Sequence, residues 1–165
     1  MRDEKEPVEV RLGHLLAARH VTIAAAESCT GGLVTSRLTD VAGSSAYVMG
    51  SIVSYTNEVK EKLVGVQHAT LAAYGAVSEE TAREMAEGVR HAIGTDIGLA
   101  TTGLAGPGGG TAEKPVGLVY TAVATATGTT VQENHFTGTR TEVKEQASEV
   151  VLTMAVEALS EDRKK

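Results

Sequence analysis

The chain has 165 residues and a formal net charge of −6, and 42% of its residues are apolar. This length fits a single domain over residues 1–165. The core must be built from small aliphatic side chains, because aromatic residues are few. They are Tyr47, Tyr55, Tyr74, Tyr120 and Phe136. The only dense basic cluster is the terminal run 163–165, which we interpret as a solvated tail. The composition therefore argues against a nucleic-acid partner.

Cysteine content and hydropathy restrict the location of the protein. Cys29 is the single cysteine, so an intrachain disulfide and a cysteine-rich zinc site are both excluded. Residues 2–6 are charged and lack the apolar stretch of a signal peptide. No apolar run approaches membrane-spanning length. We expect a cytoplasmic protein without a membrane partner.

Apolar spacing predicts alternating helices and strands in the first half of the chain. Val8, Leu12 and Leu16 recur at helical spacing, whereas the apolar run that ends at Ala26 is short and typical of a buried strand. The expected order is a helix over 7–19, a strand over 21–26, a turn over 27–32, a helix around 34–41, a break at 43–45, a strand over 47–55 and short helical pieces over 57–74.

The second half predicts a helix, three strands and a closing helix. Ser78 is a favourable N-cap and precedes two glutamates, which suit the positive end of a helix dipole. The expected order is a helix over 79–93, a strand over 96–102, a glycine-rich loop over 103–115, paired strands over 116–125 and 129–136 joined at Gly128, and a closing helix around 143–158. This order predicts an α/β domain whose mixed sheet is covered by helices.

The first candidate site is the segment Ala26–Gly32, which lies between a predicted strand and a predicted helix. Ser28 is a possible nucleophile there, with backbone N–H groups beside it to stabilise an oxyanion. Cys29 is a rival nucleophile, although a lone cysteine is commonly a small buried hydrophobic residue. Ser28 or Thr30 can equally be a simple helix cap. The residues alone leave these alternatives open.

A second candidate segment, residues 55–60, contains a tyrosine and a lysine just beyond a predicted strand. A serine nucleophile needs a base, and burial can lower the pKa of a lysine enough to leave it neutral. Lys60 is placed for this role, but an ordinary surface lysine is the alternative. Lys62 competes with it and is more typical of a solvent-facing residue.

The third candidate is the glycine-rich segment 102–111, which suits an anion-binding loop. It is not a phosphate-binding Walker loop, because no Gly-Lys-Ser/Thr ends it. A dinucleotide-binding assignment also fails, because Pro115 and a strand-like run follow where a helix is required. A flexible surface loop is the alternative. The five histidines are scattered without a metal-binding arrangement, so we expect no metal.

These segments, in this order, resemble the C-terminal domain of the competence/damage-inducible CinA family. The resemblance covers nearly the whole chain and is carried by four motifs: AESCTGG at 26–32, DVAGSSAYVMGSIVSYTNEVKEKLVGV at 40–66, YGAVSEETAREMA at 74–86 and TGLAGPGGGTAEKPVGLVY at 102–120. It implies a three-layer α/β/α sandwich that assembles into a homo-oligomer. Standalone members are similar to nicotinamide mononucleotide deamidases of pyridine-nucleotide salvage.

The resemblance implies hydrolysis of nicotinamide mononucleotide to nicotinate mononucleotide and ammonia, without a cofactor. Ser28 matches the nucleophile, Lys60 the general base and Tyr55 a residue that assists them. Arg140 matches an arginine beside the substrate phosphate. The remaining residues expected to contact substrate are Thr30, Gly31, Gly32, Ser45, Thr102, Gly103, Gly106, Gly108 and Gly109.

Three positions depart from the family pattern. Thr139 stands where the family commonly has an acid, and Lys144 stands where it has a second arginine. If the acid braces Arg140, substrate affinity or preference differs in this chain. Ala100 replaces a common serine inside a strand. The alternatives to the deamidase are a non-catalytic nucleotide-binding or interaction module, and an amidase for a different carboxamide.

Overall fold

A computed structural model describes residues 6–161, and a five-stranded mixed sheet lies at its centre. The strand order is β2-β1-β3-β4-β5. β1 pairs in parallel with β2 and β3, whereas β4 pairs antiparallel to β3 and to β5. The strands are β1 (Ile23–Glu27), β2 (Val48–Val53), β3 (Ile97–Gly103), β4 (Leu118–Thr125) and β5 (Gly128–His135).

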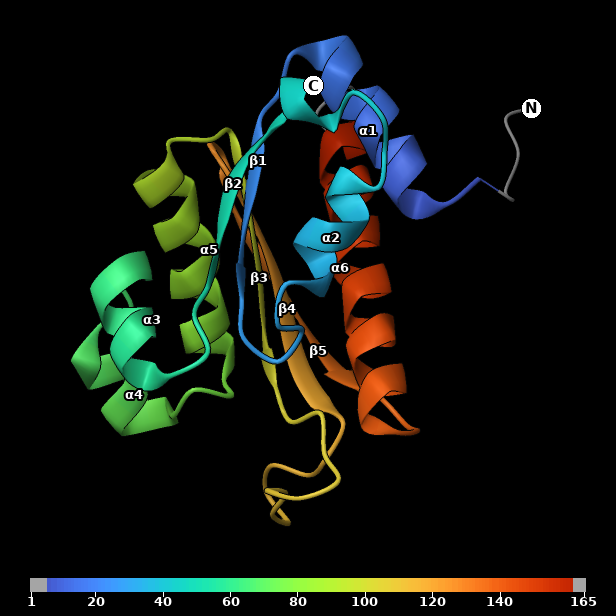
Figure 1. Cartoon of the computed structure of the whole chain (residues 1–165). Helices are drawn as coiled ribbons and strands as arrows, with labels where there is room; N and C mark the ends of the chain where they lie inside the picture. The colour runs from blue at the N-terminus through green and yellow to red at the C-terminus, as the bar shows by residue number, and fades with distance from the viewer. Residues whose placement is uncertain (1–5, 162–165) are drawn as a thin grey trace.

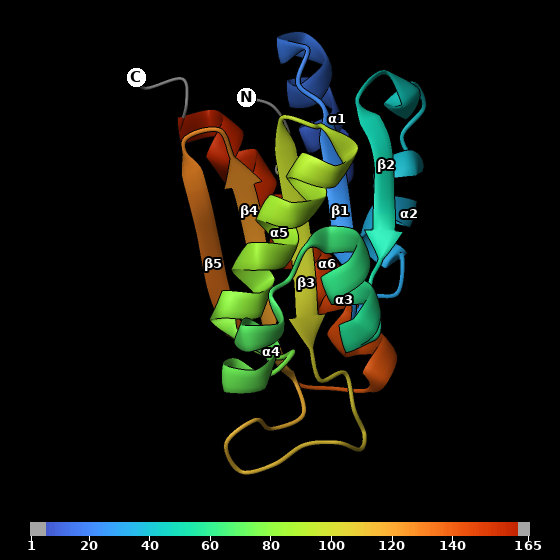
Figure 2. The same cartoon turned by 90° about the vertical axis from the view of Figure 1, so that its left-hand side faces the viewer.

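Helices cover both faces of the sheet (Figure 1). α1 (Val8–Arg19), α2 (Leu33–Thr39) and α6 (Arg140–Glu161) pack on one face, and α3 (Asn57–Val64), α4 (His68–Tyr74) and α5 (Glu79–Ile93) lie on the other. A short 3-10 helix, η1 (Ser44–Ala46), precedes β2. Figure 2 shows α5 across the middle of the sheet, with β2 and β5 at its two edges. The expected α/β/α layering is confirmed.

Two apolar clusters hold the layers together, one on each face of the sheet. Leu12 of α1 and Leu38 of α2 belong to the cluster on the α6 side, and Met85 of α5 belongs to the other. Alternate residues of β1 supply both clusters, because successive side chains of a strand point to opposite faces. Every residue of β1 is buried, so this strand, which lies between β2 and β3, is covered on both sides.

The helices and strands follow the predicted order, with ends that shift by a few residues. β1 runs to Glu27, one residue beyond the expected end, and the closing helix begins at Arg140 instead of near 143. Gly65 separates α3 from α4 in a left-handed conformation with φ +71°. In the described part of the chain, no helix is both long and apolar enough to cross a membrane.

Candidate active site

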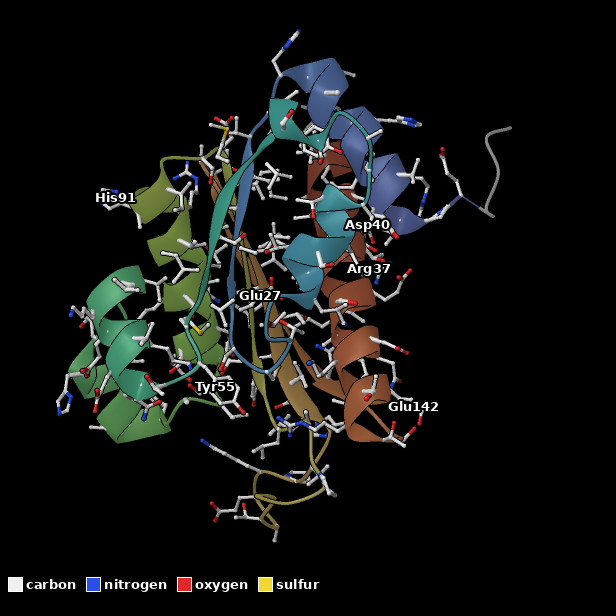
Figure 3. All side chains as sticks on the ribbon, in the orientation of Figure 1. Glu27, Arg37, Asp40, Tyr55, His91 and Glu142 are labelled. Carbon is white, nitrogen blue, oxygen red and sulfur yellow. The ribbon has the colours of Figure 1, made fainter. Side chains whose placement is uncertain are left out.

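The candidate site lies at the edge of the sheet where β1, β2 and β3 end. Because these three strands are parallel, their carboxyl ends meet there. Ser28 follows β1, Ser54 and Tyr55 follow β2, and Thr102 is near the end of β3. Figure 3 shows Tyr55 at this edge, beside α3 and close to the glycine-rich loop.

Lys60 reaches this edge from α3, and its side chain is only 1% exposed. Thr56 fixes the start of α3, because its hydroxyl accepts the Val59 N–H at 3.3 Å. The Lys60 Nζ lies 2.9 Å from Ser28 Oγ, and it donates to the Ser54 carbonyl at 2.9 Å and to the Tyr55 carbonyl at 3.0 Å. The structure thus brings Ser28 and Lys60 into direct contact, and the alternative of a surface lysine is wrong.

Burial changes the acidity of two groups at this site. Desolvation lowers the pKa of Lys60 to about 8, because the ammonium loses its hydration. Desolvation also raises the pKa of the Cys29 thiol to about 12. Cys29 packs with Ala105 and Val119 in a small apolar cluster. These surroundings keep the thiol protonated and favour the interpretation of Cys29 as a buried hydrophobic residue.

The turn after β1 is held by a carboxylate that the sequence analysis did not single out. The start of α2 has no cap from Ser28 or Thr30, so that alternative is wrong. The carboxylate of Glu27 instead accepts the N–H groups of Gly32 at 3.2 Å and Val34 at 2.8 Å. Glu27 ends β1, and a turn separates it from α2, so the sequence contains no local sign that this carboxylate is buried.

A cavity of about 280 Å³ opens beside Ser28 and Lys60. Arg140, at the first position of α6, closes one side, because its guanidinium donates to the Gly106 carbonyl at 2.7 Å and to the Tyr55 hydroxyl at 3.4 Å. The lining residues come from five segments: Ser28, Cys29, Tyr55, Lys60, Ala76, Val77, Thr102, Gly103, Leu104, Ala105, Gly106, Gly108 and Arg140. Ala76 and Val77, which line part of this wall, lie within the motif at 74–86, but they were not expected to contact substrate.

Several residues expected to contact substrate lie elsewhere. Ser45 is in η1, which precedes the amino end of β2. It therefore lies at the end of the sheet opposite to the carboxyl ends of the parallel strands, where Ser28 is. Thr30 is buried beneath the turn, where its hydroxyl donates to Glu27 at 2.7 Å. Within residues 6–161, the expected contacts that do not line the cavity are Thr30, Gly31, Gly32, Ser45 and Gly109.

The backbone donors of the two glycines in this turn are already occupied. The Gly31 N–H donates to the Ser28 carbonyl at 3.1 Å, and the Gly32 N–H donates to Glu27. The two residues adopt left-handed conformations, with φ +58° and +107°. Their left-handed conformations shape the turn, and because neither residue lines the cavity, their contact with substrate stays a prediction.

The departures near α6 have structural roles. Thr139 and Glu142 form a reciprocal capping box, in which each side chain accepts the backbone N–H of the other residue at 3.3 and 3.0 Å. Thr139 therefore caps α6, and the contacts of Arg140 with Gly106 and Tyr55 orient the guanidinium.

Lys144 lies one turn further along α6, and its Nζ is close to the backbone of Gly31. Ala100 is buried inside β3 between Ala26 and Ala122.

The fold and the site define a class of protein: an α/β/α domain with a buried serine–lysine pair at the carboxyl edge of its mixed sheet. Residues 5–159 match the family model described as the CinA C-terminal domain. The chain belongs to this family.

Relatives and solved structures agree with this membership. The chain is 58% identical over 120 residues to a CinA-like protein of Chloroherpeton thalassium, covering 73% of this chain and 29% of that protein. A CinA-like protein of Geobacter sulfurreducens is 50% identical over 137 residues, covering 83% of this chain and 33% of that protein. The chain spans about a third of the length of the curated relatives it matches.

The crystal structure of the competence/damage inducible protein CihA from Agrobacterium tumefaciens superposes with a TM-score of 0.90 at 40% identity, covering 93% of each chain. A CinA superfamily protein from Klebsiella pneumoniae superposes with the same TM-score at 33% identity, covering 93% of this chain and 96% of that one. The fold is therefore that of the family.

Proposed function

We propose that this chain is an amidase that hydrolyses the carboxamide of nicotinamide mononucleotide, with Ser28 as nucleophile and Lys60 as general base. The observation that carries the proposal is the 2.9 Å contact between Ser28 Oγ and the Nζ of the buried Lys60. A serine hydroxyl is a weak nucleophile until a base accepts its proton. The lowered pKa of Lys60 supports this role, because a neutral amine forms near physiological pH.

The contacts of Lys60 favour proton transfer from Ser28. A neutral amine keeps two hydrogens and one lone pair. The carbonyls of Ser54 and Tyr55 accept the two hydrogens, which directs the lone pair toward the Ser28 hydroxyl. These backbone carbonyls belong to the segment between β2 and α3, so the fold sets the direction of the lone pair.

The reaction then follows acyl transfer in two halves. Ser28 Oγ bonds to the amide carbon while its proton passes to Lys60. Lys60 returns the proton to the amide nitrogen, the C–N bond breaks and ammonia leaves an ester on Ser28. Water attacks this ester, Lys60 accepts a proton from the water and passes it to Ser28 Oγ, and the carboxylate product departs. The balance is one amide and one water for one carboxylate and one ammonium.

Two further features support the proposal, one for the amide chemistry and one for a substrate that carries a phosphate. The Cys29 N–H has no backbone carbonyl partner within residues 6–161, and it directly follows Ser28. An N–H in this position can stabilise the tetrahedral oxyanion. Arg140 borders the cavity beside the glycine-rich loop, and a guanidinium suits bidentate contact with a phosphate.

The test is ammonia release from nicotinamide mononucleotide without added metal. Ser28→Ala should lower kcat at least about 10³-fold, because the nucleophile is lost. Cys29→Ala is the matched control, since it removes the neighbouring buried thiol but keeps the Cys29 backbone N–H, and it should retain kcat within about threefold of wild type.

The outcomes separate the proposal from its alternatives. Turnover of free nicotinamide or glutamine in preference to the nucleotide would indicate an amidase for another carboxamide. Tight binding of the nucleotide without turnover by folded wild type would contradict the proposal and indicate a binding module.

A further inference from the structure

The side chain of Glu27 is fully buried and lies between β1 and α2 (Figure 3). Its Oε1 accepts the Thr30 hydroxyl at 2.7 Å, the Val34 N–H at 2.8 Å and the Gly32 N–H at 3.2 Å. Its Oε2 accepts the N–H and the hydroxyl of Thr35 at 2.9 and 2.6 Å. One carboxylate thus receives five hydrogen bonds from the segment that follows Ser28.

These contacts change the role of the α2 N-terminus. The first N–H groups of a helix lack intrahelical partners and attract an anion. Here the protein supplies the anion itself, because Glu27 takes the N–H groups that a bound anion would otherwise use. The substrate phosphate therefore has no free anion site at α2, and the charge of Glu27 serves the protein's own structure.

Glu27 also joins the Ser28 turn to the sheet. Its carbonyl accepts the Ser54 N–H at 2.8 Å, and the Ser28 N–H donates to the Thr101 carbonyl at 3.0 Å. The backbone thus fixes the segment at the end of β1, while the Glu27 carboxylate fixes it at the start of α2. Ser28 lies between these two anchors, with its Oγ 2.9 Å from the Lys60 Nζ.

We infer that Glu27 is a positioning residue for the nucleophile, whose buried carboxylate holds the Ser28 turn in the conformation that presents Oγ to Lys60 and the reacting carbonyl. This inference rests on the proposed function. A small displacement of a nucleophile costs a large factor in rate, because bond formation needs close and aligned atoms. The negative charge matters as well as the shape, since an amide in place of one oxygen directs donors at the N–H groups of α2.

The test compares Glu27→Gln with wild type and with Arg37→Gln. Arg37 lies on the same helix, α2, but faces α1 and α6, where its guanidinium bonds Glu9 at 2.8 Å and Glu149 at 2.6 Å. Arg37→Gln therefore disturbs α2 without touching the Ser28 turn. Thermal unfolding and circular dichroism at pH 8 measure how much of each of the three proteins is folded.

The first readout is the labelling rate of Ser28 by a fluorophosphonate, followed by intact mass, because it reports the nucleophile without depending on the amide substrate. The second is steady-state hydrolysis of nicotinamide mononucleotide. For folded Glu27→Gln we expect labelling and kcat to fall at least about tenfold, KM to stay within about threefold, and the pH midpoint of kcat to stay unchanged. Arg37→Gln should keep both rates within about threefold.

A third readout, hydrogen exchange of residues 29–36, measures the turn directly. Exchange there should accelerate in Glu27→Gln and not in Arg37→Gln. Equal labelling of Ser28 in wild type and Glu27→Gln would overturn the inference and leave the proposed function standing. Equal losses of rate in both variants would reduce Glu27 to a general stabilising residue, which also overturns it. Wild type that neither reacts with the probe nor releases ammonia would reject the proposed function, and the inference with it.

Discussion

At the scale of single residues, Lys60 shows how burial produces chemistry. An ammonium in the interior is costly unless its hydrogens find acceptors. Lys60 has three oxygen partners, at Ser28, Ser54 and Tyr55, but no carboxylate pairs with it in the described chain. Because hydrogen bonds only partly replace hydration, the neutral form gains and the pKa falls to about 8.

The pH dependence of kcat/KM should report this pKa. The neutral fraction of Lys60 rises with pH, so kcat/KM should rise about tenfold per pH unit at low pH. It should level above about 8, where the amine is deprotonated. Initial rates between pH 5.5 and 9.5 provide the measurement. Lys60→Arg serves as the control and should be inactive throughout, since a guanidinium stays charged. A profile that is flat from pH 6 to 9 would contradict Lys60 as the base.

At the scale of elements, the packing of α3 on α5 places Lys60. The Gly88 position of α5 faces the Val64 carbonyl at the end of α3, and a methyl group at Gly88 would overlap that oxygen. The glycine therefore allows the two helices to approach closely. Since Lys60 is on α3, any shift of this helix moves Nζ relative to Ser28.

Gly88→Ala should destabilise the protein although alanine is the better helix former. The propensity gain is about 1 kcal/mol, whereas overpacking costs about 1–3 kcal/mol and displaces α3. We expect a lower free energy of unfolding in urea and a reduced kcat. His91→Ala, at an exposed position one turn further along α5, should change stability by no more than about 0.5 kcal/mol. A more stable and fully active Gly88→Ala would show that α3 does not depend on this contact.

At the scale of the whole molecule, the site is assembled across the sheet. Ser28 comes from the β1–α2 turn, Lys60 from α3 on one face and Arg140 from α6 on the other. The glycine-rich loop closes the space between them and is attached at two points. Arg140 donates to the Gly106 carbonyl, and the Lys114 ammonium donates to the Tyr74 carbonyl at the end of α4.

Lys114→Ala should loosen this loop without altering the serine–lysine pair. This hydrogen bond is exposed to solvent, so it should contribute about 0.7–1.4 kcal/mol, less than a buried charged hydrogen bond, and we expect KM to rise about threefold to tenfold with kcat within twofold. Steady-state kinetics and limited proteolysis of the loop provide the measurements. Glu113→Ala is the adjacent exposed control and should behave as wild type. An unchanged KM with increased cleavage would show that loop order is not required for substrate binding.

The expected homo-oligomer stays a prediction. It is compatible with the exposed apolar side chains of the edge strand β2, where Met49 and Val53 are 57% and 50% exposed.

The sequence by itself determined the order of helices and strands, because hydrophobic periodicity and turn residues act locally. The spacing around Leu12 and the N-cap at Ser78 each predict features that the structure contains. The motifs also selected Ser28 and Lys60, which the structure brings into contact.

Only the tertiary structure decided which polar groups meet. Ser45 is near Tyr55 in the sequence, but the extended strand β2 carries it to the opposite edge of the sheet. Glu27 ends an apolar run and has no local sign of burial, yet the packing of α2 on β1 encloses its carboxylate among backbone N–H groups. Periodicity specifies the face on which a side chain lies, whereas hydrogen-bond partners depend on how distant segments pack.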